Sequence, residues 1–197
     1  MLRLLLQPDR PLRSLDATFL NMFDSSVGAT GSVWSTEVVL AEIFRFTYVF
    51  TANVIQPYAV TLSDMRLPTN GSGTYMAYES NNTLASGIFP VDLTKPLVIN
   101  ACGELDFQLY TLCPVLANGW TFLGESDKWV SVSNQRFSQL SFDSVSVSVV
   151  VSGDVGEVVI GLFLSPSHEL VSVPCSIPVD GTVRISVGTT GGSCLSV

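Results

Sequence analysis

The clearest strand pattern in the chain is Phe44-Arg-Phe-Thr-Tyr-Val-Phe-Thr-Ala-Asn-Val54. Apolar side chains take every second position, and the positions between them carry arginine, threonine, valine or asparagine. Because successive side chains of a strand point to opposite faces, this period of two gathers the aromatic rings on one face. Aromatic and β-branched residues also fit a pleated sheet best. The segment therefore predicts a strand with a strongly apolar face.

The same alternation recurs along the chain beyond residue 33, at 105–109, 145–151 and 183–187. Pairs of turn-forming residues separate the runs, and we expect each pair to close a β-hairpin. These pairs are Asn70-Gly71, Asn118-Gly119, Gly153-Asp154 and Asp180-Gly181. Short strands with turns at this spacing predict an all-β fold, an antiparallel two-sheet β-sandwich. No stretch after residue 33 keeps a helical period for the ten or twelve residues that a helix usually needs.

The predicted sandwich covers residues 33–197 as one domain. Its expected core consists of Phe44, Phe46, Tyr48, Phe50, Leu105, Phe107, Leu109, Val147 and Val149. Residues 1–32 are expected to form an N-terminal strap, either irregular or with one short helix over 14–23. The helix would begin at Ser14, a suitable N-cap, and its apolar residues would share one face. The apolar run at residues 4–6 is too short for a secretory signal peptide.

Composition excludes some classes of partner. Hydrophobic residues make up 47% of the 197 residues and charged residues 13%, so the chain can fill a core. The formal net charge is −8, from 17 acidic and 9 basic residues, with no local cluster of lysine and arginine. Such a chain repels phosphate backbones and anionic lipid surfaces, so we expect no nucleic-acid partner. No apolar run reaches the roughly 18 to 20 residues of a membrane span.

Four cysteines leave the redox compartment open: Cys102, Cys113, Cys175 and Cys194. No two cysteines form a closely spaced pair, and the chain has a single histidine, so it lacks the usual ligands of a zinc site. We therefore expect neither a metal nor a cofactor. Four buried free thiols are the favoured interpretation, because free cysteine behaves as a small hydrophobe. A Cys175–Cys194 or a Cys102–Cys113 bridge is the alternative. N-glycosylation sequons are present at Asn70 and Asn81. They would be used only in a secretory compartment, which is the localisation we favour.

Candidate chemical groups are few. The histidine, His168, lies in a serine-rich turn with Ser165 and Ser167 but without a nucleophile elbow, so a solvated turn residue is expected. Glu104 and Asp106 share a strand face, and we interpret them as the wet side of an amphipathic strand. We therefore expect no catalytic residue.

A ligand or interface contact is the minority interpretation for a second acidic pair, Glu125 and Asp127, in the turn 123–129. A surface charge cluster or a turn cap is favoured for both. Trp129, between Lys128 and Val130, is the best candidate for an exposed ring on which a sugar could stack. These three residues are the tentative contact site.

Short segments in a particular order span most of residues 4 to 163. They are Leu4-Leu-Leu-Gln-Pro-Asp-Arg-Pro11, Leu15-Asp-Ala-Thr-Phe19, Val33-Trp-Ser-Thr36, Tyr48-Val-Phe-Thr-Ala-Asn53, Ser63-Asp-Met-Arg-Leu67, Tyr75-Met-Ala-Tyr-Glu79, Tyr110-Thr-Leu-Cys-Pro-Val115, Trp120-Thr-Phe-Leu-Gly-Glu125, Val130-Ser-Val-Ser133 and Arg136-Phe137. Their order resembles the carboxy-terminal β-domain of α-galactosidase and raffinose-synthase-like glycoside hydrolases. In that family the catalytic aspartates belong to a (β/α)8 barrel that precedes this domain. The resemblance therefore implies an accessory domain, whose partner is the barrel of the parent chain.

Three classes of function remain open at this point. The first is the accessory domain of a glycoside-hydrolase-like protein. The second is a freestanding β-sandwich module that binds carbohydrate or serves in adhesion or a capsid. The third is a small independent enzyme, which would need turnover that depends on a named carboxylate such as Glu125.

Overall fold

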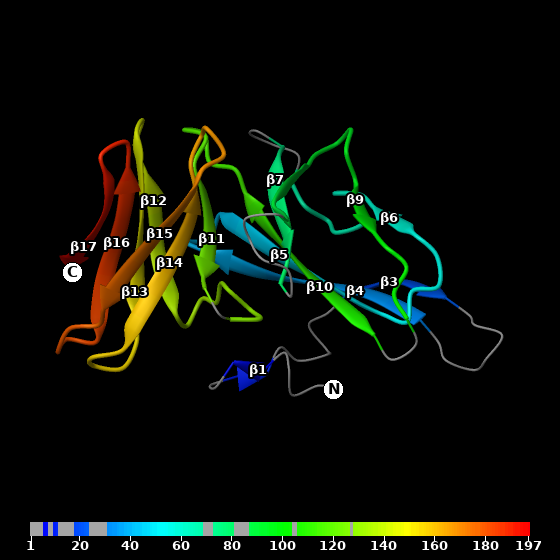
Figure 1. Ribbon diagram of the computed structural model, residues 1–197, viewed down its shortest axis with the longest axis horizontal. Coiled ribbons are helices and arrows are strands. Elements are labelled where there is room, and N and C mark those ends of the chain that lie inside the picture. Colours follow the sequence, from blue (N-terminus) through cyan, green and yellow to red (C-terminus); the bar gives the residue numbers. More distant parts are fainter. Residues whose placement is uncertain are drawn as a thin grey trace. The chain divides into compact units, whose positions relative to one another are not determined.

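The computed structural model describes residues 6–7, 10–11, 18–23, 31–68, 73–80, 87–103, 106–126 and 128–197. Strands form nearly all of the regular structure in these residues, which confirms the predicted all-β, antiparallel fold (Figure 1). The strands are β1 (Leu6–Gln7), β2 (Arg10–Pro11), β3 (Thr18–Phe23), β4 (Gly31–Leu40), β5 (Phe44–Ala52), β6 (Tyr58–Val60), β7 (Tyr75–Glu79), β8 (Phe89–Val91), β9 (Leu97–Ile99), β10 (Phe107–Pro114), β11 (Thr121–Glu125), β12 (Phe137–Phe142), β13 (Ser146–Ser152), β14 (Val158–Leu164), β15 (Leu170–Ser176), β16 (Thr182–Gly188) and β17 (Gly191–Ser196).

The chain divides into two compact units, which interleave along the sequence. Unit 1 comprises residues 1–37 and 47–112, and unit 2 comprises residues 38–46 and 113–197. The strand and turn pattern of the sequence predicts one domain at 33–197, and this domain range stays a prediction.

Unit 1 is built on a sheet with strand order β3-β4-β5-β10-β7-β8, together with the two-stranded sheet β6-β9. Strand β5 lies between β4 and β10, and its antiparallel ladder with β10 runs from Ala52 opposite Phe107 to Thr47 opposite Leu112. One apolar cluster fills the unit; it includes Val49, Tyr110 and Leu112 from the ladder. The aromatic segment 44–54 thus forms a central strand of the sheet.

Unit 2 contains two antiparallel sheets, β11-β14-β15 and β12-β13-β16-β17. The Phe122 ring on β11 lies 5.0 Å from the Phe137 ring on β12, which joins the two sheets, and 5.1 Å from the Phe163 ring on the neighbouring strand β14 of its own sheet. Strand β15 contacts both β16 and β17 of the other sheet. Alternating burial along β16 supplies Val183, Ile185 and Val187 to this core, in agreement with the predicted period of two. Unit 2 is a β-sandwich.

Most predicted core residues of the alternating segments are buried. Phe46, Tyr48, Leu109, Val147 and Val149 are each at most 1% exposed. Phe44, Phe50 and Phe107 are only partly buried, and Leu105 lies outside the described residues. On β5 both sets of side chains are buried between residues 46 and 49, so neither face of the strand is left to solvent there.

Three of the four predicted turns lie within the described residues, and none of these three closes a hairpin. Gly119 (φ 85°) follows β10, which belongs to the six-stranded sheet, and β11 begins the three-stranded sheet of unit 2. Residues 153–157 and 177–181 each cross from one sheet of unit 2 to the other. The hairpins of unit 2 are β12–β13, β14–β15 and β16–β17. A turn residue shows that the chain reverses, but it does not show which strand the next one will pair with. Asn70-Gly71 lies outside the described residues.

The short helix proposed for residues 14–23 is wrong where the structure describes it. Residues 18–23 form strand β3, which pairs with β4 from Thr18 opposite Ser35 to Phe23 opposite Gly31. The ladder contains an irregularity between Phe19 and Asn21. Pairing with a long neighbouring strand supplies backbone hydrogen bonds that outweigh a weak local helical pattern. Residues 14–17 lie outside the described residues.

A glycine in β11 allows two backbone segments of unit 2 to approach closely. Gly124 has φ 103° and lies at an irregularity of the β11–β14 ladder. A Cβ at this position would overlap the carbonyl oxygen of Ser131. The Ser131 carbonyl also accepts a hydrogen bond from the Glu125 N–H at 2.8 Å. The close approach therefore sets the position of Glu125.

We expect Gly124→Ala to lower the free energy of unfolding by about 3 kcal/mol or more, because strained backbone and a backbone clash add together. Gly156→Ala is the matched control: its φ is 83°, but nothing lies within 4 Å of the added Cβ. It should cost only about 1 kcal/mol, from backbone strain alone. Urea denaturation followed by circular dichroism measures both. Equal losses would show that the contact with Ser131 is unimportant.

Candidate functional site

Glu125 is the best defined of the tentative contact residues. It ends β11 and is 7% exposed. Arg136, which directly precedes β12, donates to it from Nε (3.1 Å to Oε2) and from Nη2 (3.1 Å to Oε1). A fork of this kind matches the planar guanidinium to the planar carboxylate, so both oxygens of Glu125 are engaged.

Arg136 binds a second carboxylate with the other edge of its guanidinium. Nη2 donates to Glu157 Oε1 at 2.6 Å, and Nη1 donates to Glu157 Oε2 at 2.8 Å. Nη1 also donates to the backbone carbonyl of Ser152 at 3.0 Å. A guanidinium has five N–H donors, and these contacts use all of them. We call the group of Arg136, Glu125, Glu157 and the Ser152 carbonyl the Arg136 cluster.

The Arg136 cluster joins the two sheets of unit 2. Glu125 and Glu157 lie at the end of β11 and just before β14, in one sheet. Arg136 and Ser152 lie just before β12 and at the end of β13, in the other. The Ser152 N–H in turn donates to the Arg136 carbonyl at 2.8 Å, which fixes the backbone of both residues. The cluster therefore fastens the sheets to each other at the end where residues 153–157 cross between them.

Gly153 leaves the space that the cluster needs. A Cβ on this residue would lie 2.5 Å from Glu157 Oε2 and 2.6 Å from Arg136 Nη1. The Gly153 N–H donates to the Gly181 carbonyl at 3.0 Å, so the two crossing segments 153–157 and 177–181 are joined beside the cluster. A larger residue at position 153 would force the ion pairs apart.

The electrostatics of the cluster favour the ionised forms of Glu157 and Arg136. The hydrogen bonds from Arg136 lower the pKa of Glu157, against a smaller opposing effect of burial. The bonds to Glu157 and Glu125 raise the pKa of Arg136. A general acid needs a carboxyl that holds a proton near neutral pH and faces a substrate. Here Arg136 opposes protonation of Glu157, and both Glu125 oxygens accept hydrogen bonds from the same guanidinium, so the arrangement suits structural fastening better than proton transfer.

Glu125 is the tentative contact residue that belongs to the Arg136 cluster. Asp127 lies outside the described residues. Trp129 is partly buried, where the sequence analysis expects an exposed ring. The sequence did not predict that Arg136 binds Glu125, or that the same arginine binds Glu157. Arg136 is 11 residues from Glu125 and 21 residues from Glu157 along the chain, and no local motif links them.

The remaining candidate groups form ordinary turn contacts. His168 is exposed with φ 63°, and its N–H donates to the Ser165 carbonyl at 2.9 Å. The hydroxyls of Ser165 and Ser167 are hydrogen-bonded to each other at 2.8 Å. Asp106 is exposed, and Glu104 lies outside the described residues. Within the described part of the chain, no three His, Cys, Asp or Glu residues are grouped so as to hold a metal ion. The described residues also contain no helix of the length and apolar character that crossing a bilayer requires.

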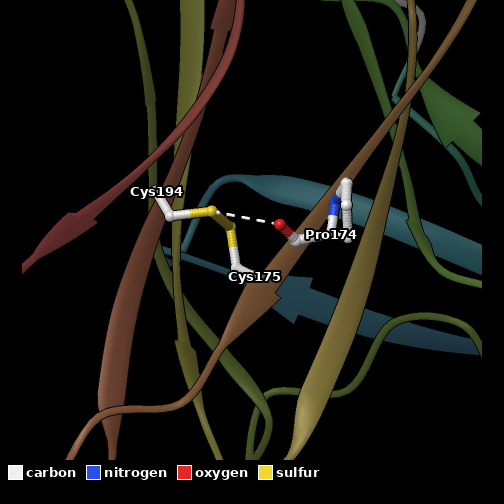
Figure 2. The surroundings of a disulfide bond; sticks show 3 residues. All are labelled: Pro174, Cys175 and Cys194. Carbon is white, nitrogen blue, oxygen red and sulfur yellow. Dashed lines mark hydrogen bonds between the residues drawn. A yellow bond between two sulfur atoms is a disulfide. The ribbon is translucent and has the colours of Figure 1, made fainter.

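The favoured interpretation of four free thiols is wrong for two of the cysteines. Cys175 on β15 and Cys194 on β17 form a disulfide, which links the two sheets of unit 2 (Figure 2). The sulfur of Cys194 also lies 3.2 Å from the Pro174 carbonyl oxygen. Cys113 is free and fully buried, and burial raises the pKa of its thiol. Cys102 is free and partly buried, and its sulfur accepts the Val54 N–H at 3.2 Å.

Comparison of the chain with protein-family models, with curated proteins and with solved structures found no match.

We expect Arg136→Gln to lower the free energy of unfolding by about 3 kcal/mol, because it leaves the buried Glu125 carboxylate without a countercharge. Glu157→Gln is the control within the same cluster. The Glu157 side chain is 32% exposed against 8% for Glu125, so solvent compensates part of the loss and we expect about 1 kcal/mol. Urea unfolding at pH 7 measures both variants, and a larger loss for Glu157→Gln would contradict the assigned order.

The lowered pKa of Glu157 also predicts how stability depends on pH. In the unfolded chain a glutamate has a pKa of about 4.3. In the folded chain the pKa of Glu157 is lower. Its contribution is therefore fully present above about pH 4.3 and is lost as the pH falls through the folded pKa. The stability difference between the native chain and Glu157→Gln should stay nearly constant from pH 6 to about pH 5 and then shrink as urea midpoints are measured down to pH 2.5. A difference that does not change with pH would refute this assignment.

Proposed function

We propose that this chain is the non-catalytic accessory β-domain of a glycoside-hydrolase-like protein and that it packs on a (β/α)8 barrel of the parent chain. The observation that carries the proposal is the order of the segments between residues 4 and 163, which resembles the carboxy-terminal β-domain of α-galactosidase and raffinose-synthase-like enzymes. In that family the domain supports the barrel that holds the catalytic aspartates.

The state of Glu125 supports a supporting role over a catalytic one. A retaining or inverting glycosidase needs two carboxyl groups, of which one carries a proton and both face the sugar. Glu125 is the buried carboxylate of the described residues, and both of its oxygens accept from Arg136. Its partner Glu157 faces the same guanidinium from the other side. The pair is therefore held apart by a cation instead of enclosing a substrate.

Glu125 and Arg136 also belong to segments that carry the family resemblance. Glu125 ends the segment Trp120–Glu125, and Arg136 begins the pair Arg136-Phe137, two of the segments that resemble the family. The side chains that these segments contribute, Phe122 and Phe137, form the aromatic contact between the sheets. In this proposal the two segments are those that hold the accessory domain together.

The full-length transcript tests the proposal directly. We expect the reading frame to continue upstream of Met1 into a sequence that encodes an alternating strand–helix barrel. The protein that includes the barrel should hydrolyse or transfer an α-galactoside, and removal of residues 33–197 should make it insoluble or unstable. An upstream sequence without a barrel would overturn the proposal.

Assays of the chain itself separate the competing classes of function. We expect no hydrolysis of aryl α-galactosides and no saturable binding to immobilised α-galactosides. Trp129→Ala and Glu125→Gln, each checked for folding by circular dichroism, are the diagnostic variants. Sugar binding that is lost in Trp129→Ala would instead establish a freestanding carbohydrate-binding module. Turnover that is lost in Glu125→Gln would establish an independent enzyme.

A further inference from the structure

Strand β17 (Gly191–Ser196) is held to unit 2 by few interactions. All of its residues are exposed, and Gly191 and Gly192 carry no side chain. It pairs with one strand, β16, from Val183 opposite Ser196 to Gly188 opposite Gly191. It also contacts β15 in the other sheet, where Gly192 lies against the Val173 side chain and the Cys175–Cys194 bond joins the two strands. An edge strand with so little buried surface belongs to the least stable part of a fold.

The two cysteines of the bond differ in their exposure to solvent. Cys175 is 2% exposed and points inward on β15, as Val173 does. Cys194 lies on the exposed strand β17 (Figure 2). Thiol–disulfide exchange requires a thiolate to reach one of the two sulfurs, and access decides which one it attacks. A dissolved thiol therefore meets Cys194 first.

We propose that β17 is a thiol-releasable edge strand, opened by attack of a small thiol on Cys194 and closed again by Cys175. In the opening step the incoming thiolate forms a new S–S bond with Cys194 Sγ. The Cys175–Cys194 bond breaks, and its electron pair passes to Cys175 Sγ, which takes a proton from water. A second molecule of thiol then reduces the mixed disulfide and leaves as a small-molecule disulfide. In the closing step the Cys194 thiolate attacks that small-molecule disulfide, which re-forms the mixed disulfide and releases one small thiol. The Cys175 thiolate then attacks Cys194 Sγ and expels the second small thiol.

The released state differs from the native one over a limited region. Loss of the bond removes the covalent link between β15 and β17 and leaves β17 with its β16 ladder and its non-covalent contacts with β15. Separation of β17 would uncover Val173 and Cys175, which are 5% and 2% exposed in the closed state, and would make β16 the edge of its sheet. The Arg136 cluster and the Phe122 contacts do not involve β17, so the rest of the sandwich keeps its core. Release is thus a local change that responds to the thiol content of the surroundings.

The test uses the full chain with Cys102→Ser, which removes the partly exposed free thiol, while Cys113 stays fully buried. The protein is treated with reduced glutathione, quenched in acid and digested for mass spectrometry. We expect the first adduct on Cys194. Hydrogen exchange of the reduced protein should be faster by about tenfold or more at 191–196, with little change at 146–152 and 158–164.

The variant Cys175→Ala/Cys194→Ala is the control for the structural effect. It should exchange rapidly at 191–196 without thiol and should not respond to glutathione. Should this variant fail to fold, reduction of the folded disulfide form supplies the same comparison. A first adduct on Cys175 would overturn the proposal. Slow exchange at 191–196 after full reduction, or simultaneous loss of protection throughout unit 2, would overturn it equally.

Discussion

The five N–H groups of Arg136 are the constraint on which unit 2 depends. They donate to oxygen atoms from three parts of the chain: two from Glu125 at the end of β11, two from Glu157 in the turn before β14, and one from Ser152 at the end of β13. A guanidinium is planar and rigid, so it can donate to all of these oxygen atoms only when they lie in one arrangement. The contacts therefore do more than add stability, because they fix how the strand ends of the two sheets face each other. Gly153 and Gly124 are the positions where the backbone yields space for that arrangement.

Secondary structure was the part that local sequence could predict. The alternation in 145–151 and 183–187 became β13 and β16, with the expected valine and isoleucine side chains buried. Period two is a property of each strand by itself, so it survives whatever the partner strand is. Pairing is different. Gly153 and Gly181 mark turns correctly, yet the next strand joins the opposite sheet, since the choice of partner is made by packing across the whole unit. For the same reason β3 formed where the local apolar spacing suggested a helix.

The candidate site shows the same limit more sharply. Glu125 stood out in the sequence as an acid in a glycine-containing turn, but its environment depends on Arg136 and Glu157, which are distant along the chain. Whether an acid is a catalyst, a ligand or an ion-pair partner follows from such contacts and not from its neighbours in sequence. The disulfide was equally hard to predict. Cys175 and Cys194 are separated by 19 residues, and only the facing of β15 and β17 brings them together.

The order in which the hairpins alternate between sheets has a consequence for biosynthesis. Hairpin β12–β13 belongs to one sheet, β14–β15 to the other, and β16–β17 returns to the first. The valine-rich strand β13 must therefore wait for β16, which is made more than thirty residues later. Until the ribosome has released residues 182–188, a nascent chain presents Val147, Val149 and Val151 on an open strand, a surface prone to aggregation.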